Sequence, residues 1–190
     1  IEREISNAQS GLPSGITVKV NSLVDPDIIE RLYRASKAGV TVNLIVRGIC
    51  CLIPGLENIS ENIHVHSIVG QLLEHSRIFR FENAGNPKIY MGSADWMPRN
   101  LDRRVELVFP IDDPDLKTRA FQILDLMWND NKNTRVMQPD TSYLRIDRRG
   151  KPLCNCQLMF AALSRQAVKD LEKLDKNEPF QPIHSADLKN

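Results

Sequence analysis

A strand–helix–strand unit near the start of the chain is the feature that most limits its fold. Residues 16–24 (ITVKVNSLV) begin with alternating apolar and polar side chains, and residues 40–46 (VTVNLIV) are apolar enough to form a central strand. Between them, Asp25 suits the N-cap of a helix, Pro26 its first position and Gly39 its end. So short a crossover predicts that the two strands are parallel neighbours in one sheet.

Similar patterns along the chain predict a mixed α/β sheet with flanking helices. A second helix follows an N-cap at Asp113, and its apolar stripe begins at Ala120. Turn-forming residues at 83–87 (NAGNP) separate two short runs that are typical of paired strands. The expected strands after residue 46 are 63–69, 76–83, 88–93 and 105–111.

The chain becomes polar after Asn129. Residues 131–156 contain prolines and a glycine and are expected to hold at most short strands, whereas residues 157–174 predict a final amphipathic helix. The last residues, 175–190, resemble a loose tail. We therefore predict an α/β domain over residues 1–143 and a C-terminal extension over residues 144–190.

Composition limits the classes of function. The chain has 190 residues, 42% hydrophobic and 26% charged, with a formal net charge of +1, so it lacks the broad basic field typical of nucleic-acid binding. No apolar run approaches the roughly 20 residues of a membrane-spanning helix. The four cysteines lack zinc-knuckle spacing and are interpreted as reduced thiols. Because the chain starts at Ile1, we expect a fragment of a larger cytoplasmic protein; peripheral contact with the inner membrane stays open.

Basic residues gather where predicted strands end or begin. Arg47 directly follows the strand 40–46, His75 lies two residues before Arg77, and further arginines crowd the stretch up to Arg104. Ligands of open α/β sheets bind outside the carboxyl ends of strands. If the strand 105–111 is antiparallel to the strand 40–46, its beginning meets the end of that strand. Arg47 and Arg104 are then expected to converge at that edge.

This combination of residue types predicts phosphate chemistry. Guanidinium groups match phosphate oxygens, and a histidine among them can transfer a proton or take up the phosphoryl group. Positive neighbours lower the pKa of such a histidine and keep a nitrogen lone pair free. Two alternatives remain open. The arginines can pair with Asp95, Asp102 and Glu106 on a solvated face, and His75 can be structural.

Other polar and aromatic residues have simpler interpretations. His64 and His66 share one face of an extended segment but have no nearby third ligand, so we predict no metal site. Trp96 and Met97 are interpreted as packing residues rather than as a platform for stacked bases.

Several segments resemble the C-terminal domain of the polyphosphate kinases of the first bacterial type. The similar segments are IVRGICCL, LEHSRIF, GITVKVNSLVDPDIIERLYRAS and above all SADWMPRNLDRRVELVFPI, and the resemblance runs from residue 1 to about residue 143. It implies a fold group similar to phospholipase D, in which two α/β halves each supply a histidine motif. This chain is then the second half.

The resemblance also shows departures from the phospholipase D pattern, which is His-x-Lys, an acid seven residues after the His, and Gly-Ser-x-Asn. Here His75 is followed by Arg77 in place of Lys, Glu82 stands at the acid position, and the turn Gly92–Asp95 ends in Asp in place of Asn. These departures fit the kinase branch rather than a working phosphodiesterase.

The family implies an activity and roles for individual residues. Its members transfer the terminal phosphate of ATP reversibly to inorganic polyphosphate through a phosphohistidine, which here would lie upstream of Ile1. By resemblance, His75 is the second essential histidine, Arg47 and Arg104 contact phosphates, and Arg77 is a further phosphate ligand. Ser93, Asp95 and Glu82 are expected to support them.

The remaining requirements of the family fall outside this chain. Mg²⁺ is the expected cofactor, with its ligands elsewhere, and the expected partners are ATP or ADP, polyphosphate, the other domains of the same polypeptide and a homo-oligomer, but no nucleic acid. We expect the fragment alone to be inactive. The rival interpretations are a phospholipase D-like phosphodiesterase or nuclease half, which predicts Lys at position 77, and a polyanion-binding module that needs no histidine.

Overall fold

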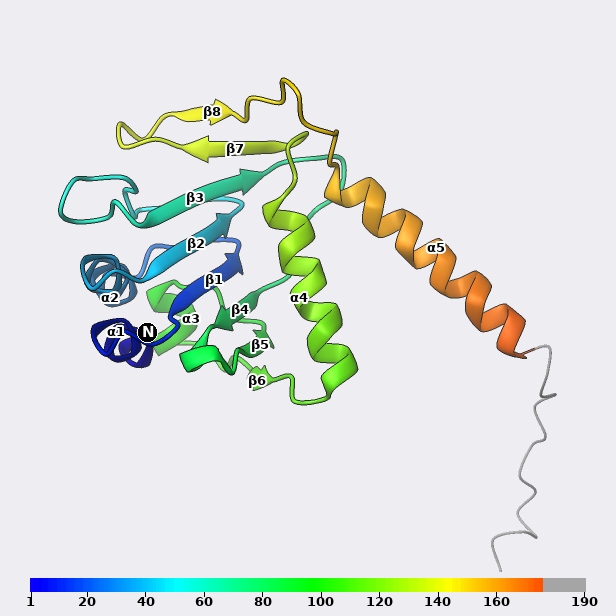
Figure 1. Ribbon diagram of the computed structural model, residues 1–190, viewed down its shortest axis with the longest axis horizontal. Helices are drawn as coiled ribbons and strands as arrows, with labels where there is room; N and C mark the ends of the chain where they lie inside the picture. Colours follow the sequence, from blue (N-terminus) through cyan, green and yellow to red (C-terminus); the bar gives the residue numbers. More distant parts are fainter. Residues whose placement is uncertain (176–190) are drawn as a thin grey trace, which may run out of the picture. The chain divides into compact units, whose positions relative to one another are not determined.

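The computed structural model describes residues 1–175, of which residues 1–155 form one compact unit and the second unit begins at Cys156. The first unit is built on an eight-stranded sheet with the strand order β6-β5-β4-β1-β2-β3-β7-β8 (Figure 1). Its strands are β1 (Gly15–Val20), β2 (Thr41–Val46), β3 (Ile63–Ile68), β4 (Ile78–Phe81), β5 (Lys88–Gly92), β6 (Val108–Pro110), β7 (Thr134–Met137) and β8 (Tyr143–Arg145). The helices are α1 (Glu2–Gln9), α2 (Pro26–Lys37), the short 3-10 helix η1 (Asn83–Gly85), α3 (Pro98–Asp102), α4 (Pro114–Trp128) and α5 (Cys156–Asp175).

The strand–helix–strand unit forms as predicted. β1 and β2 are parallel neighbours at the centre of the sheet, and Gly15 pairs with Thr41 at the start of their register. The side chain of Asp25 caps α2 by accepting a hydrogen bond from the backbone N–H of Ile28 at 3.0 Å. Pro26 takes the first helical position, where its missing N–H costs nothing.

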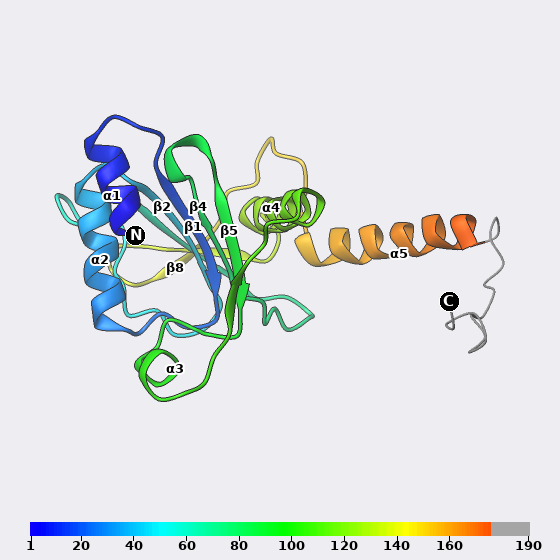
Figure 2. The same cartoon turned by 90° about the horizontal axis from the view of Figure 1, so that it is seen from below.

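Helices cover both faces of this sheet. Figure 2 shows α1 and α2 on one face and α4 on the other. Val18, Leu32 and Val42 belong to the larger cluster of fully buried apolar residues on the α1 and α2 side. Ile78 and Leu124 belong to a second cluster, to which β4, β5 and α4 contribute. The prediction of a mixed α/β sheet with flanking helices is therefore confirmed.

The strand directions bring several chain segments to one edge of the sheet. β1, β2 and β3 are parallel and end at this edge, whereas β4 and β7 are antiparallel to their neighbours and begin there. We call it the carboxyl edge, and it includes Asn21 after β1, Arg47 after β2, Val69 after β3, Arg77 before β4 and Thr134 at the start of β7.

Two sequence predictions need adjustment or stay open. The strand expected over residues 105–111 is reduced to β6, because Glu106 is drawn into side-chain hydrogen bonds with Ser93 and Asn100. β8 begins at Tyr143 and pairs with β7, so the sheet continues past the domain boundary predicted at residue 143, which stays a prediction.

The C-terminal elements follow the sequence pattern. The polar segment after α4 holds only the short strands β7 and β8, and α5 is the predicted final helix. The predicted tail, from residue 176 onward, lies outside the described residues. Within residues 1–175, no helix is both long enough and apolar enough to span a membrane.

Candidate phosphate site at the carboxyl edge of the sheet

Asn21 joins the polar groups at the centre of the carboxyl edge. Its side-chain oxygen Oδ1 accepts hydrogen bonds from Lys19 Nζ at 3.2 Å and from Arg47 Nε at 3.0 Å. Its amide Nδ2 donates to Asp95 Oδ1 at 3.3 Å and to the carbonyl of His75 at 3.5 Å. Since Asn21 is only 4% exposed, it fixes the relative positions of these groups from inside the fold.

Lys19 is a buried cation that sequence reasoning missed. It is 1% exposed, and Nζ donates to the carbonyls of Glu74 at 2.7 Å and Ser76 at 2.9 Å. Burial, aided by the positive charge of Arg47, lowers its pKa to about 8, although the Glu74 carboxylate acts in the opposite direction. The residues on either side of His75 are therefore anchored to β1 by Lys19. The sequence did hold a signal for this residue. A central strand has both faces covered, so a lysine near its end predicts a buried charge that needs hydrogen-bond partners.

Arg77 and Asp95 form a mostly buried ion pair. Arg77 Nη2 lies 2.9 Å from Asp95 Oδ2, and the two side chains are 13% and 8% exposed. The backbone N–H of Asn21 also donates to Asp95 Oδ1, at 2.6 Å. Burial raises the pKa of Asp95, but the hydrogen bonds from Arg77 and Asn21 outweigh this and hold it below its usual value. Arg77 also donates from Nη1 to the carbonyl of His75 at 3.0 Å, so the pair holds the histidine backbone as well.

The imidazole of His75 is exposed above this network. The positive charge of Arg77, then its slight burial and the charge of Arg47, lower its pKa below 6.5, against the opposing effect of Asp95. The direction agrees with the prediction from the sequence. A neutral imidazole at pH 7 offers one N–H donor and one nitrogen lone pair to a ligand.

The turn from Gly92 to Asp95 connects this network with β6, the edge strand next to β5. Ser93 donates from Oγ to Glu106 Oε2 and accepts a hydrogen bond from the N–H of Leu107 at 3.1 Å. A Cβ at position 92 would collide with the carbonyl of Leu107 and the backbone of Val108, so glycine is required for β6 to approach β5. The Ser93 hydroxyl, together with Asn100, lowers the pKa of Glu106.

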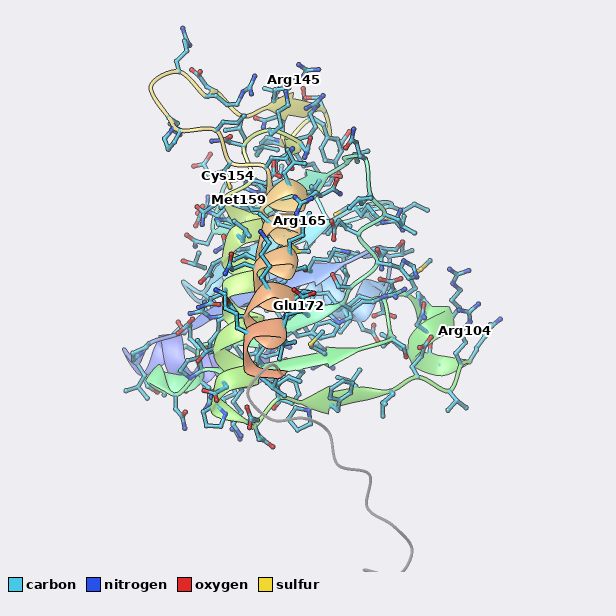
Figure 3. All side chains as sticks on the ribbon, turned by 90° about the vertical axis from the view of Figure 1, so that its right-hand side faces the viewer. Arg104, Arg145, Cys154, Met159, Arg165 and Glu172 are labelled. Atoms are coloured by element: carbon cyan, nitrogen blue, oxygen red, sulfur yellow. The ribbon has the colours of Figure 1, made fainter. Side chains whose placement is uncertain are left out.

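Arg104 lies at the same edge of the sheet as Arg47. The sequence hypothesis of convergence is right about direction, because β6 runs antiparallel to β5 and begins at the carboxyl edge. The proximity of the two arginines stays a prediction, because β5, β4 and β1 lie between β6 and β2, but Arg104 stands in the loop before β6. This loop crosses from β5 to the end of β1, where the N–H of Trp96 donates to the carbonyl of Ser22. In Figure 3, Arg104 projects from the loop after α3.

The alternative that the arginines form ion pairs with Asp95, Asp102 and Glu106 on a solvated face applies only in part. Arg77 does pair with Asp95, but inside the fold rather than in solvent. Glu106 is bound by Ser93 and Asn100, and among the described side chains no ion pair of Arg104 is recorded. Arg104 therefore remains an exposed cation at one end of the edge.

Glu82 is not brought to this site. It follows the end of β4 at the opposite edge of the sheet, where its backbone N–H donates to the carbonyl of Gly15 at the start of β1. Its carboxylate pairs with Arg80 at 2.8 Å. The structure thus brings together Arg47, His75, Arg77, Asp95 and the missed Lys19 and Asn21, with Ser93 beside them.

Two other residues singled out in the sequence, His66 and Trp96, are packed against aromatic rings. His66 stacks on Trp128 of α4 with ring centroids 3.9 Å apart, and burial lowers its pKa to about 4. Trp96 is 7% exposed and packs near Phe79, which confirms its interpretation as a packing residue. Within residues 1–175, no group of three or more His, Cys, Asp or Glu residues is placed to hold a metal ion.

Comparison with known proteins identifies the family. The profile of "Polyphosphate kinase C-terminal domain 2" matches residues 1–157. The polyphosphate kinase of Lactiplantibacillus plantarum is 52% identical over 169 residues, which are 89% of this chain and 24% of that protein. The polyphosphate kinase of Escherichia coli K12 is 49% identical over 158 residues, which are 83% of this chain and 23% of that protein. The chain thus spans about a quarter of the length of these relatives.

Solved structures give the same result. The crystal structure of polyphosphate kinase from Porphyromonas gingivalis matches with a TM-score of 0.83 and 38% identity, over 90% of this chain and 26% of that chain. A phospholipase D family member from Salmonella typhimurium matches with a TM-score of 0.51 and 19% identity, over 71% of this chain and 88% of that chain, which shows the shared fold alone. The chain belongs to the polyphosphate kinase family, as its C-terminal domain with a phospholipase D-like fold.

Proposed function

We propose that this chain supplies one half of the active site of a polyphosphate kinase, which transfers the terminal phosphate of ATP reversibly to inorganic polyphosphate. The phosphorylated histidine of that reaction would lie upstream of Ile1, and this chain would contribute the second histidine and the groups that bind phosphates. The proposal rests on the family membership and on the carboxyl edge.

The observation that carries the proposal is the pair of cations on Asn21. Lys19 and Arg47 both donate to Oδ1 of this one neutral amide. The nearby Asp95 carboxylate is already engaged by Arg77 and by backbone N–H groups. Lys19 Nζ uses its three N–H groups inside the fold, whereas only Nε of Arg47 has a hydrogen-bond partner among the described residues. An anionic ligand at this position would therefore gain charge-assisted hydrogen bonds from the terminal nitrogens of Arg47, with the charge of Lys19 nearby.

Each predicted site residue at the carboxyl edge has a proposed role. Arg47 would bind a phosphate beside His75, and Arg104 would bind another phosphate further along the edge. Arg77 would act mainly by holding the His75 backbone and keeping the imidazole neutral, with its remaining N–H groups available to a phosphate. Asp95 would orient Arg77, and Ser93 would position the turn that carries Asp95.

The imidazole of His75 suits contact with a transferring phosphate. In its neutral form it can donate an N–H bond to a phosphate oxygen, and its other nitrogen can accept a proton. Charge building on the phosphoryl oxygens during transfer would be stabilised by Arg47. We expect Mg²⁺ to be bound by residues outside this chain, and no role of His75 or Arg47 depends on its position.

The setting of the enzyme is also a proposal. ATP or ADP and polyphosphate would be the substrates, the remaining domains of the same polypeptide would close the site, and the full-length protein would form a homo-oligomer in the cytoplasm. The isolated 190-residue chain would then bind phosphate chains without turning them over.

The test replaces His75 by Gln in the full-length protein and measures polyphosphate synthesis from ATP. We expect at least about a hundredfold loss of activity, the lower range for removing a group that transfers a proton. His64→Gln is the matched control, because His64 is an exposed histidine of β3 outside the network. Near-normal synthesis by the His75 variant with intact polyphosphate binding would favour the polyanion-binding module. Hydrolysis of a phosphodiester by the wild type would favour the nuclease half.

A further inference from the structure

A second basic hollow lies at the β7–β8 end of the carboxyl edge. It has a volume of about 250 Å³, and its lining includes Lys132, Thr134, Arg135, Arg145 and Arg148. All four basic residues belong to the loop before β7, to the β7–β8 hairpin or to the segment after it. Figure 3 shows Arg145 on this hairpin, apart from Arg104. No residue named above as part of the His75 network contributes to the hollow.

The positive charge of this hollow is not neutralised by the fold. Arg135 and Arg145 are direct cross-strand partners, an arrangement in which like charges repel. No carboxylate lines the hollow, and no ion pair joins any of its four basic side chains to a described residue. The neighbouring Asp147 is bound by Arg149, and Asp130 is buried and accepts the backbone N–H of Lys132 and Asn133.

The hollow also contains polar groups suited to an oxyanion. Thr134 lies in its lining, is 1% exposed, and its hydroxyl oxygen has no hydrogen-bond partner. Asn131 and Asn133 complete the polar lining, and both are tied to the segment before α5, through the carbonyl of Pro152 and the side chain of Asn155. The lining contains no aromatic ring on which a nucleic-acid base would stack, which favours a phosphate chain without bases.

The hollow lies near the site around His75, at the same edge of the sheet. Ser67 donates to the carbonyl of Arg47 at 3.2 Å, and the next residue, Ile68, pairs with Thr134. Two strand spacings, roughly 10 Å at about 4.8 Å each, therefore separate the strand before Arg47 from the strand that carries Arg135. A single extended polyanion would reach both.

We propose that the hollow rimmed by Lys132, Arg135, Arg145 and Arg148 is a second oxyanion site, which holds a polyphosphate chain away from its reacting end. The identity of the ligand rests on the proposed function, whereas the site itself rests on the hollow. Binding at two linked sites would give a long chain a higher affinity than a short one, because the second contact becomes intramolecular.

The experiment titrates the 190-residue chain with tripolyphosphate and with long-chain polyphosphate by calorimetry at low salt. In the wild type we expect the long chain, compared at equal phosphate-chain ends, to bind about tenfold or more tightly than tripolyphosphate. In the double variant Arg135→Gln/Arg145→Gln this ratio should fall close to one. The control Arg31→Gln/Arg34→Gln removes the same charge from α2, where both arginines pair with Glu2, and should leave the ratio unchanged.

Two further readouts separate the outcomes. Amide signals of residues 132–136 should shift on addition of tripolyphosphate to the wild type, and a substituted chain that keeps its other amide signals is still folded. An unchanged affinity ratio in the folded Arg135→Gln/Arg145→Gln variant overturns the second site, as does tighter binding of single-stranded DNA than of polyphosphate of equal charge. If the full-length wild type makes no polyphosphate while these shifts persist, the proposed function fails and the oxyanion site stands.

Discussion

Arg47 Nε donates a hydrogen bond to Asn21 Oδ1 at 3.0 Å, and through this contact the end of β2 is joined to the end of β1. The same oxygen accepts from Lys19 Nζ, so a neutral amide holds two cations beside the exposed His75. Positive charge is thereby concentrated at a place where the Asp95 carboxylate is already engaged by Arg77 and by the backbone N–H of Asn21. A chain with a net charge of only +1 can in this way present a strong local anion site.

Replacing Asn21 by Ala should destabilise the protein by about 2 kcal/mol, because it removes the partners of buried and charged donors. Urea unfolding of the wild type and the variant measures the difference. Asn43→Ala is a control in the neighbouring strand β2, where the side chain is only partly buried. Equal losses of unfolding free energy in Asn21→Ala and Asn43→Ala would show that the hydrogen bonds of Asn21 add nothing to stability beyond those of an ordinary strand residue.

The pKa of His75 should lie below 6.5 and should rise when a positive neighbour is removed. Arg47→Gln is a suitable change, because Arg47 is half-buried and its loss leaves the Arg77–Asp95 pair intact. NMR titration of the imidazole measures both values. An unchanged midpoint in Arg47→Gln would show that the two side chains do not interact.

Lys19 predicts a specific pH dependence of stability. In the folded chain its proton is lost near pH 8, whereas in the unfolded chain it is held up to about 10.5, so the unfolded chain binds more protons between these values. Raising the pH through this window should therefore stabilise the wild type relative to Lys19→Met, a variant without the titrating group. Below pH 8 the cost of burying the charge is fully present. Urea unfolding at a series of pH values measures the difference in unfolding free energy between the wild type and Lys19→Met. A difference that stays constant or falls as the pH rises would contradict the prediction.

Two arginines of the edge should differ sharply in their effect on folding. Arg77→Gln breaks a mostly buried ion pair and should cost about 3 kcal/mol of unfolding free energy, since Asp95 is left without its partner. Arg104→Gln should change it by less than about 0.5 kcal/mol, because the side chain is exposed and pairs with no carboxylate within residues 1–175. Thermal or urea unfolding of both variants decides the matter. Similar losses in both would show that the burial of the pair is not what stabilises it.

Local patterns were sufficient to predict most of the fold. The cap at Asp25, Pro26 and the apolar strands on either side of α2 fixed the parallel pair β1–β2, because a short crossover permits little else. The strand over residues 105–111 was predicted too long, since its first residues are held by the distant Ser93, and no local pattern reports such a contact.

The candidate site was predicted less completely, for a physical reason. Residue types singled out His75, Arg47 and Arg77, but Lys19 and Asn21 lie in or directly after a strand that looks like core. Their importance comes from contacts across the sheet, which depend on strand order.

The most direct test of the carboxyl edge as a phosphate site is the calorimetric titration of this chain with polyphosphate at two salt concentrations. We expect binding that weakens at the higher salt, as screened charges require, and that is about tenfold weaker or more in Arg47→Gln/Arg104→Gln, which keeps only the hollow around Arg135 and Arg145. The control Arg31→Gln/Arg34→Gln should bind as the wild type does. Full binding by the Arg47/Arg104 variant, or equal loss in the control, would contradict the assignment of the phosphate site to this edge.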